Sequence, residues 1–144
     1  MMIFLLFQKV FSQENLGKKK NGMNGQKKSR SEEISAKYFE FLDRHIDDVI
    51  SARTADFMGL SQIASELGIS HKHLIDVIQH EFGNHPGYFY DNRIIKITKE
   101  ILLKEDVSIA EIARKFTYDP SNFSKFFKKR TGQTPGDFRK QYKY

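Results

Sequence analysis

The chain has 144 residues, no cysteine and 13 phenylalanines, so it has room for one ordinary domain and excludes disulfides, thiolate metal sites and cysteine nucleophiles. Its net charge of +6 is unevenly distributed, because residues 1–30 sum to +6, residues 31–91 to −7 and residues 92–144 to +7. A polyanion would be attracted to the first and last of these segments and repelled by the middle one.

Residues 1–30 are predicted to form a flexible, basic N-terminal arm. The opening apolar run at residues 3–7 is too short to span a bilayer and lacks the preceding basic residue of a secretory signal. Residues 17–30 combine Gly and Asn with six basic side chains, a composition typical of disorder. Such an arm can follow a nucleic-acid backbone, and a solvated tail is an equally good interpretation.

Hydrophobic periodicity predicts an all-α domain over residues 31–144. Ser31 is expected to cap the first helix, because its hydroxyl can accept a hydrogen bond from a backbone N–H of the first turn. Glu32 and Glu33 complement the positive end of the helix. Apolar residues then recur every three or four positions, which predicts one buried face and an end near Arg53.

A first helix-turn-helix unit is predicted at about residues 57–83. A short helix ends near Leu67, and Gly68 supplies the left-handed residue that reverses the chain. Ser70 then caps a second helix, which Gly83 ends. This second helix of a unit is called its recognition helix below.

A linker helix is predicted at about residues 86–104, followed by a second unit at about 108–132. Ser108 with Glu111 forms a capping box for the first helix of this unit. Asp119 and Pro120 begin its recognition helix. A final short helix is expected from Pro135 through Phe138, with a frayed tail after it.

The two units repeat at a constant offset of 49 residues. The matched positions are Ile63 with Ile112, Ala64 with Ala113, Leu74 with Phe123, Ile78 with Phe127, Gly83 with Gly132, Pro86 with Pro135, Gly87 with Gly136 and Phe89 with Phe138. One supersecondary unit is therefore present twice.

The repeated pattern at 63–78 and 112–127, with the closing Thr-Gly-Gln-Thr-Pro and Phe138-Arg139, resembles the DNA-binding domain of AraC/XylS-type bacterial transcription regulators. The resemblance implies seven helices, in which two helix-turn-helix units joined by a long linker helix place their recognition helices in successive major grooves. Three departures stand out. Thr117 replaces the turn glycine of the second unit, and Asp76 stands where the family often has a basic or amide residue. The thirty residues before the first helix are too few to be expected to fold into the sensory domain usual in the family.

If both units dock as the family's do, residues near the start of each recognition helix read bases and flanking cations hold phosphates. In the second unit, buried Phe123, Phe126 and Phe127 would fix the rotation of the helix. The expected base-reading residues there are Ser121, Asn122 and Lys125, and the expected phosphate contacts are Lys128, Lys129 and Arg130.

In the first unit the expected base-reading residues are His71, Lys72, His73 and Asp76, with Gln79 near the phosphates. Asp76 can accept from cytosine N4 but repels phosphates, so it favours few sequences. We therefore expect the first unit to select sequence and the second to supply most of the affinity.

The five histidines all lie in the acidic segment, three of them on the first recognition helix. Their protonation below neutral pH would make that surface more favourable to DNA. A metal site formed by His71, His73 and Asp76 is an alternative, although the usual ligand spacing is missing.

Together these features predict a bacterial, cytoplasmic, sequence-specific DNA-binding regulator, activator or repressor, without cofactor or catalytic step. No phosphate-cradling glycine loop or nucleophile motif is present. The expected partners are double-stranded DNA and RNA polymerase, with no membrane. The alternative is a helical protein-interaction module with vestigial DNA binding, whose acidic first half docks a basic partner.

Overall fold

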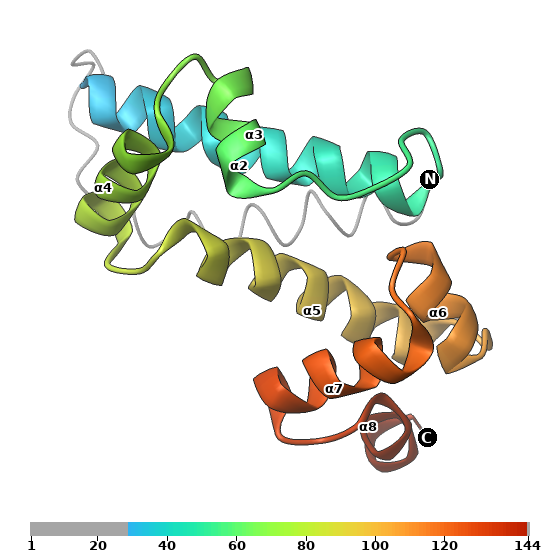
Figure 1. The fold of residues 1–144 in the computed structure, drawn as a ribbon. Coiled ribbons are helices and arrows are strands. Elements are labelled where there is room, and N and C mark those ends of the chain that lie inside the picture. Colours follow the sequence, from blue (N-terminus) through green and yellow to red (C-terminus); the bar gives the residue numbers. More distant parts are fainter. Residues whose placement is uncertain (1–28, 144) are drawn as a thin grey trace.

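The computed structural model describes residues 29–143, which form seven α-helices and no strand in that part of the chain (Figure 1). The helices are α2 (Arg30–Ile50), α3 (Leu60–Glu66), α4 (His71–Phe82), α5 (Pro86–Lys104), α6 (Ile109–Lys115), α7 (Pro120–Thr131) and α8 (Pro135–Tyr142). The all-α, seven-helix prediction is confirmed. The expected basic arm lies almost wholly outside the described residues.

Helix α2 begins earlier and ends earlier than predicted. Its cap is Ser29 and not Ser31, because Glu32 completes a capping box: Ser29 Oγ accepts the Glu32 N–H at 3.2 Å, and Glu32 Oε1 accepts the Ser29 N–H at 2.8 Å. The helix ends at Ile50, because Ala52 has a left-handed φ of 61° that turns the chain.

Helix α5 is the spine of the molecule. Helices α2 and α4 pack on it from the N-terminal side of the chain, and α6 and α8 pack on it from the C-terminal side (Figure 1). Two polar contacts, one buried and one partly buried, join α2 to this spine. The Tyr38 hydroxyl donates to the Pro86 carbonyl oxygen at 2.8 Å, and the fully buried Arg93 donates from Nε to Asp43 Oδ1 at 2.8 Å. Burial raises the pKa of Tyr38, so its hydroxyl stays protonated.

The 49-residue repeat is visible in the fold. Helices α3 and α6 each have seven residues, and Ile63 and Ile112 are both fully buried. The recognition helices α4 and α7 each have twelve residues and end at left-handed glycines, Gly83 with φ 79° and Gly132 with φ 87°. The predicted duplication of one unit is confirmed.

The turn of the second unit keeps the geometry of the first despite its missing glycine. Gly68 has φ 76° and Thr117 has φ 59°. In each turn the next residue donates its N–H to the same alanine carbonyl, Ile69 to Ala64 at 3.0 Å and Tyr118 to Ala113 at 2.9 Å. A β-branched residue in this conformation costs roughly 1 kcal/mol, so the turn of the second unit is strained.

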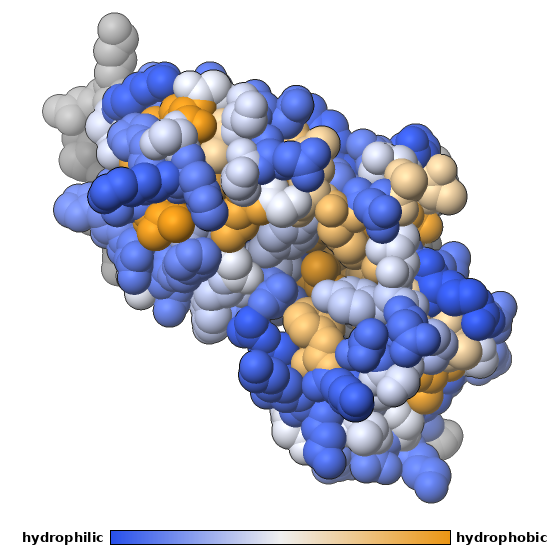
Figure 2. Space-filling model, in the orientation of Figure 1, coloured by the Kyte–Doolittle hydropathy of each residue, from blue (hydrophilic) through white to orange (hydrophobic). Residues whose placement is uncertain are grey.

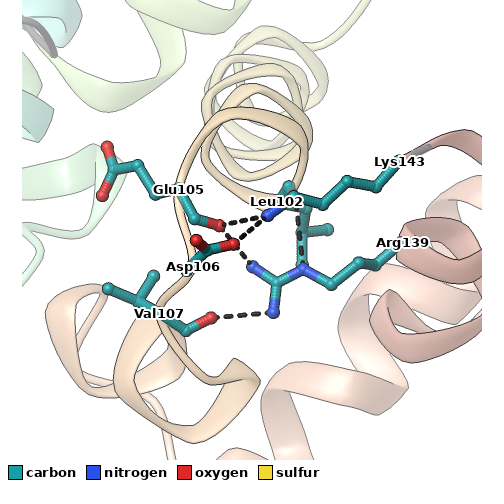
Figure 3. Close-up of polar contacts among 6 residues, drawn as sticks. All are labelled: Leu102, Glu105, Asp106, Val107, Arg139 and Lys143. Atoms are coloured by element: carbon teal, nitrogen blue, oxygen red, sulfur yellow. Dashed lines mark hydrogen bonds and ion pairs between the residues drawn. The ribbon is translucent and has the colours of Figure 1, made fainter.

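The prediction that the tail frays from Lys140 is wrong for residues 140–142, since α8 continues to Tyr142. Figure 3 shows the reason. The guanidinium of Arg139 donates to the carbonyl oxygens of Leu102, Glu105 and Val107 at 3.0, 3.1 and 2.7 Å. Lys143 Nζ also donates to the Glu105 carbonyl oxygen at 2.9 Å. The bonds satisfy carbonyls at the end of α5 and after it, and fix α8 to them.

No helix in the described residues is long and apolar enough to cross a membrane.

Candidate nucleic-acid interface

The two recognition helices hold their predicted site residues on solvent-facing surfaces. Apolar residues at helical spacing turn one face of each helix inward, namely Leu74, Val77 and Ile78 in α4 and Phe123 and Phe127 in α7. All eleven residues expected to contact DNA are exposed: His71, Lys72, His73, Asp76, Gln79, Ser121, Asn122, Lys125, Lys128, Lys129 and Arg130. Their side chains are therefore accessible to a partner.

One residue expected to anchor α7 is less buried than predicted. Phe126 is only partly buried, and its ring stacks on Tyr118 with centroids 5.4 Å apart and an interplanar angle of 16°. The face that packs inward is centred on Phe123 and Phe127, which leaves Phe126 at its edge. The rotation of α7 is thus fixed by two core phenylalanines and a flanking aromatic pair.

Helix α4 neutralises its one lysine. Lys72 Nζ lies 2.9 Å from Asp76 Oδ2, one helical turn away, and the two side chains are 84% and 60% exposed. Water screens such an exposed pair, so its contribution to stability is small. Its effect on recognition is larger, because the lysine enters an interface with a carboxylate already beside it.

Helix α7 presents its cations differently. Within residues 29–143, Lys125, Lys128 and Lys129 make no ion pair with another side chain. Arg130, at the last turn, pairs with Asp91 of α5. Burial raises the pKa of the Asp91 carboxyl, and the charge of Arg130 opposes that rise. Three lysines of α7 are therefore available to phosphates, while Arg130 has a carboxylate partner.

The structure does not support the metal alternative. No group of three or more His, Cys, Asp or Glu side chains in the described part of the chain is arranged to hold a metal ion.

A groove of about 490 Å³ runs between α5, the turn after α4 and the last turn of α7. In Figure 2 the surface is hollowed between the lobe that holds α4 and the lobe that holds α7. Lys96, Lys99 and Arg130 line the groove beside the exposed ring of Tyr88. Lys96 and Lys99 are not among the predicted contacts, because helical periodicity shows that they face outward but not that α7 ends beside them.

Comparisons with known proteins agree with this arrangement. A family described as a helix-turn-helix domain matches residues 63–141. The chain is 32% identical over 99 residues to an uncharacterised HTH-type transcriptional regulator, YfiF, of Bacillus subtilis (strain 168). That alignment covers 69% of this chain and 30% of the relative, so the chain spans under a third of that relative's length.

Two solved structures have similar folds. The C-terminal domain of AraT, a response regulator from Geobacillus stearothermophilus, is 25% identical with a TM-score of 0.69, covering 81% of this chain and 91% of that domain. The DNA-binding domain of AdpA, solved in complex with a target DNA, is 16% identical with a TM-score of 0.61, over 80% of this chain and 94% of that one. This second likeness concerns the fold alone.

Proposed function

The chain belongs to the AraC-type family of helix-turn-helix transcription regulators, and on that premise we propose that it places α4 and α7 in two successive major grooves of double-stranded DNA. The observation that carries this proposal is the pair of equivalent recognition helices, whose predicted contact residues are all exposed. Helix α4 packs directly on α5, and α7 packs on α6 and α8, which themselves pack on α5, so the two recognition helices meet the duplex as one body.

The second unit is the anchor in this proposal. Lys125 donates to guanine O6 and N7, and Asn122 pairs with adenine N6 and N7, with Ser121 beside them. Lys128 and Lys129 neutralise phosphates. Support comes from the charge of α7, whose three lysines have no carboxylate partner among the described residues.

The first unit acts as the selective reader. Asp76 accepts from cytosine N4, and Lys72 must leave that carboxylate to contact a base or share it in the complex. His71 and His73 flank this pair, and Gln79 contacts the backbone further along α4. A carboxylate in the groove disfavours most sequences, so this unit contributes discrimination more than affinity.

Arg130 reaches a phosphate by exchanging its partner Asp91 for the DNA backbone. We add Lys96 and Lys99 as candidate phosphate contacts, since they share the groove with Arg130. Regulation would follow from binding beside a promoter and contacting RNA polymerase, in the bacterial cytoplasm and without a cofactor or catalytic step.

A salt series of duplex binding tests this function. The logarithm of the binding constant should fall linearly with the logarithm of salt concentration, by a slope of about 0.9 for each phosphate neutralised. Lys128→Ala together with Lys129→Ala should lower that slope by about 2. A chain that binds no duplex at low salt would instead support the protein-interaction module, which the comparisons do not favour.

A further inference from the structure

The loop of residues 51–59 carries a phenylalanine where the repeat places an aspartate in the second unit. Phe57 corresponds to Asp106 at the 49-residue offset. The Asp106 side chain is 98% exposed and pairs with Lys143. Phe57 is half-buried and packs against the core. The same position therefore faces water in the second unit and makes aromatic contacts in the first.

Phe57 touches three parts of the molecule. Its ring lies 5.9 Å from that of His45 in α2 and 6.0 Å from that of Tyr90 in α5, both edge to face. It stacks at 6.5 Å and 14° on Phe116, which follows α6. Phe116 in turn stacks at 5.8 Å and 15° on Phe123 of α7. A continuous row of rings thus joins the loop of the first unit to the second recognition helix.

The backbone beside Phe57 is held in place. The Met58 N–H donates to His45 Nε2 at 2.9 Å, and the Met58 carbonyl oxygen accepts the Tyr90 hydroxyl at 2.9 Å. Earlier in the loop, Arg53 makes ion pairs with two carboxylates of α2. Figure 1 shows this loop returning from the end of α2 on the side where α6 lies. The loop is therefore a fixed support for the ring.

Helix α5 is long, and long helices are rarely straight, so it does not by itself fix the orientation of one unit relative to the other. Two contacts away from its axis oppose such bending. One is the stack of Phe57 on Phe116, and the other is the ion pair between Arg130 of α7 and Asp91 in the first half of α5. The first contact joins the loop and the second unit directly.

We propose that Phe57 is a positioning residue that fixes the orientation of α7 relative to α4, and so sets the half-site spacing that the protein accepts. This inference rests on the proposed two-groove binding. In a bivalent binder the second contact gains an effective concentration that is lost when geometry forbids simultaneous engagement. We call the stack of Phe57 on Phe116 the brace. Because the brace holds the recognition helices at one distance, the protein should prefer operators whose half-sites have the matching spacing.

The DNA test uses duplexes selected by the wild-type chain from a random pool. Changing the separation of the two half-sites by two base pairs should weaken wild-type binding by about tenfold or more, and binding of Phe57→Ala by less than about threefold. Binding to each isolated half-site should stay near the wild-type value. Phe57→Leu, which keeps apolar volume without the ring stack, should behave like Phe57→Ala. Asp106→Ala, at the equivalent position, is the matched control and should keep the wild-type spacing profile.

A second measurement needs no DNA. The chain has no cysteine, so Ser65→Cys and Arg114→Cys, two exposed positions related by the same offset, can carry spin labels. The distance distribution between them should broaden in Phe57→Ala and Phe57→Leu and stay narrow in Asp106→Ala. An unchanged distribution, or an unchanged spacing profile with intact duplex binding, overturns the brace alone. A wild-type chain that needs only one half-site overturns two-groove binding, and the brace with it.

Discussion

Tyr90 and Arg139 occupy equivalent positions of the 49-residue repeat. Each donates to the carbonyl oxygen that precedes the cap of the first helix of the unit it follows. In the first unit the Tyr90 hydroxyl reaches Met58 at 2.9 Å, and in the second Arg139 Nη1 reaches Val107 at 2.7 Å. Arg139 makes two further bonds and carries a charge. The same backbone contact is thus made by a neutral hydroxyl in one half of the repeat. In the other half it is made by a charged guanidinium that donates three hydrogen bonds.

The surfaces of the two recognition helices differ in the same way. In α4 the lysine lies beside a carboxylate, whereas three lysines of α7 have no such partner among the described residues. A duplicated scaffold therefore keeps its core and turns while its polar residues diverge. Two units with the same fold therefore need not contribute equally to DNA binding or to stability.

The largest expected effect comes from removing the charged donor. Arg139→Ala should lower the free energy of unfolding by about 3 kcal/mol, because carbonyls at the end of α5 lose charged hydrogen bonds. Tyr90→Phe removes one neutral bond and should cost about 1 kcal/mol. Urea denaturation at a constant m-value measures both. Equal losses would contradict the difference between the units.

The next largest effect is expected on the affinity for DNA. Lys125→Ala should weaken binding to a fixed operator by about 1–3 kcal/mol, because it removes a base contact from the anchoring helix. Lys72→Ala should cost less than about 1 kcal/mol, since Asp76 already balances that charge. Fluorescence anisotropy of a labelled duplex gives both values. A larger loss for Lys72→Ala reverses the assignment of anchor and reader.

The two turns offer a reciprocal pair of changes. Thr117→Gly should stabilise the chain by about 0.5–1 kcal/mol, because glycine adopts the left-handed conformation without strain. Gly68→Ala should destabilise it by about 1 kcal/mol. A Cβ at Gly68 would meet no atom within 4 Å, so that loss reports backbone strain alone. Thermal or urea unfolding measures the change in the free energy of unfolding of each variant. Changes of the same sign in the two variants would refute the equivalence of the turns.

The smallest effect is a pH dependence located where α2 contacts the loop before α3. Burial lowers the pKa of His45 from its ordinary 6.5, with Asp48 opposing the shift, and its Nε2 must be unprotonated to accept from Met58. Stability from this contact is complete above about pH 6.5 and decreases as pH falls through the lowered pKa. Between pH 7.5 and 5.5, His45→Gln should therefore lose less stability than the wild type. His80→Gln, at an exposed site, should keep the wild-type slope.

Much of the fold could be predicted because helix ends are encoded locally. Helix boundaries are set by backbone conformation and hydrogen bonds within a few residues. Examples are the left-handed glycines, the capping box of Ser108 with Glu111, and the proline after Asp119. Ser29 was missed because two serines lie near Glu32, and only Ser29 stands at capping-box distance. The pairing of Lys72 with Asp76 was accessible to sequence reasoning as an i, i+4 pair and was overlooked.

The contacts between units could not be predicted in this way. Asp91 and Arg130 are 39 residues apart, and Phe57 and Phe116 are 59 apart. No local pattern specifies such pairs, because they depend on how α5 presents both units. The same reason hid the cations Lys96 and Lys99 beside the end of α7. The roles of the exposed residues on α4 and α7 stay predictions.

Selection of bound sequences from a random duplex pool, followed by binding to each half-site alone, tests the central claim most directly. We expect two half-sites about one helical turn apart, with the larger loss of affinity when the half-site of α7 is scrambled. Recovery of a single half-site, or a larger loss for the half-site of α4, would contradict it.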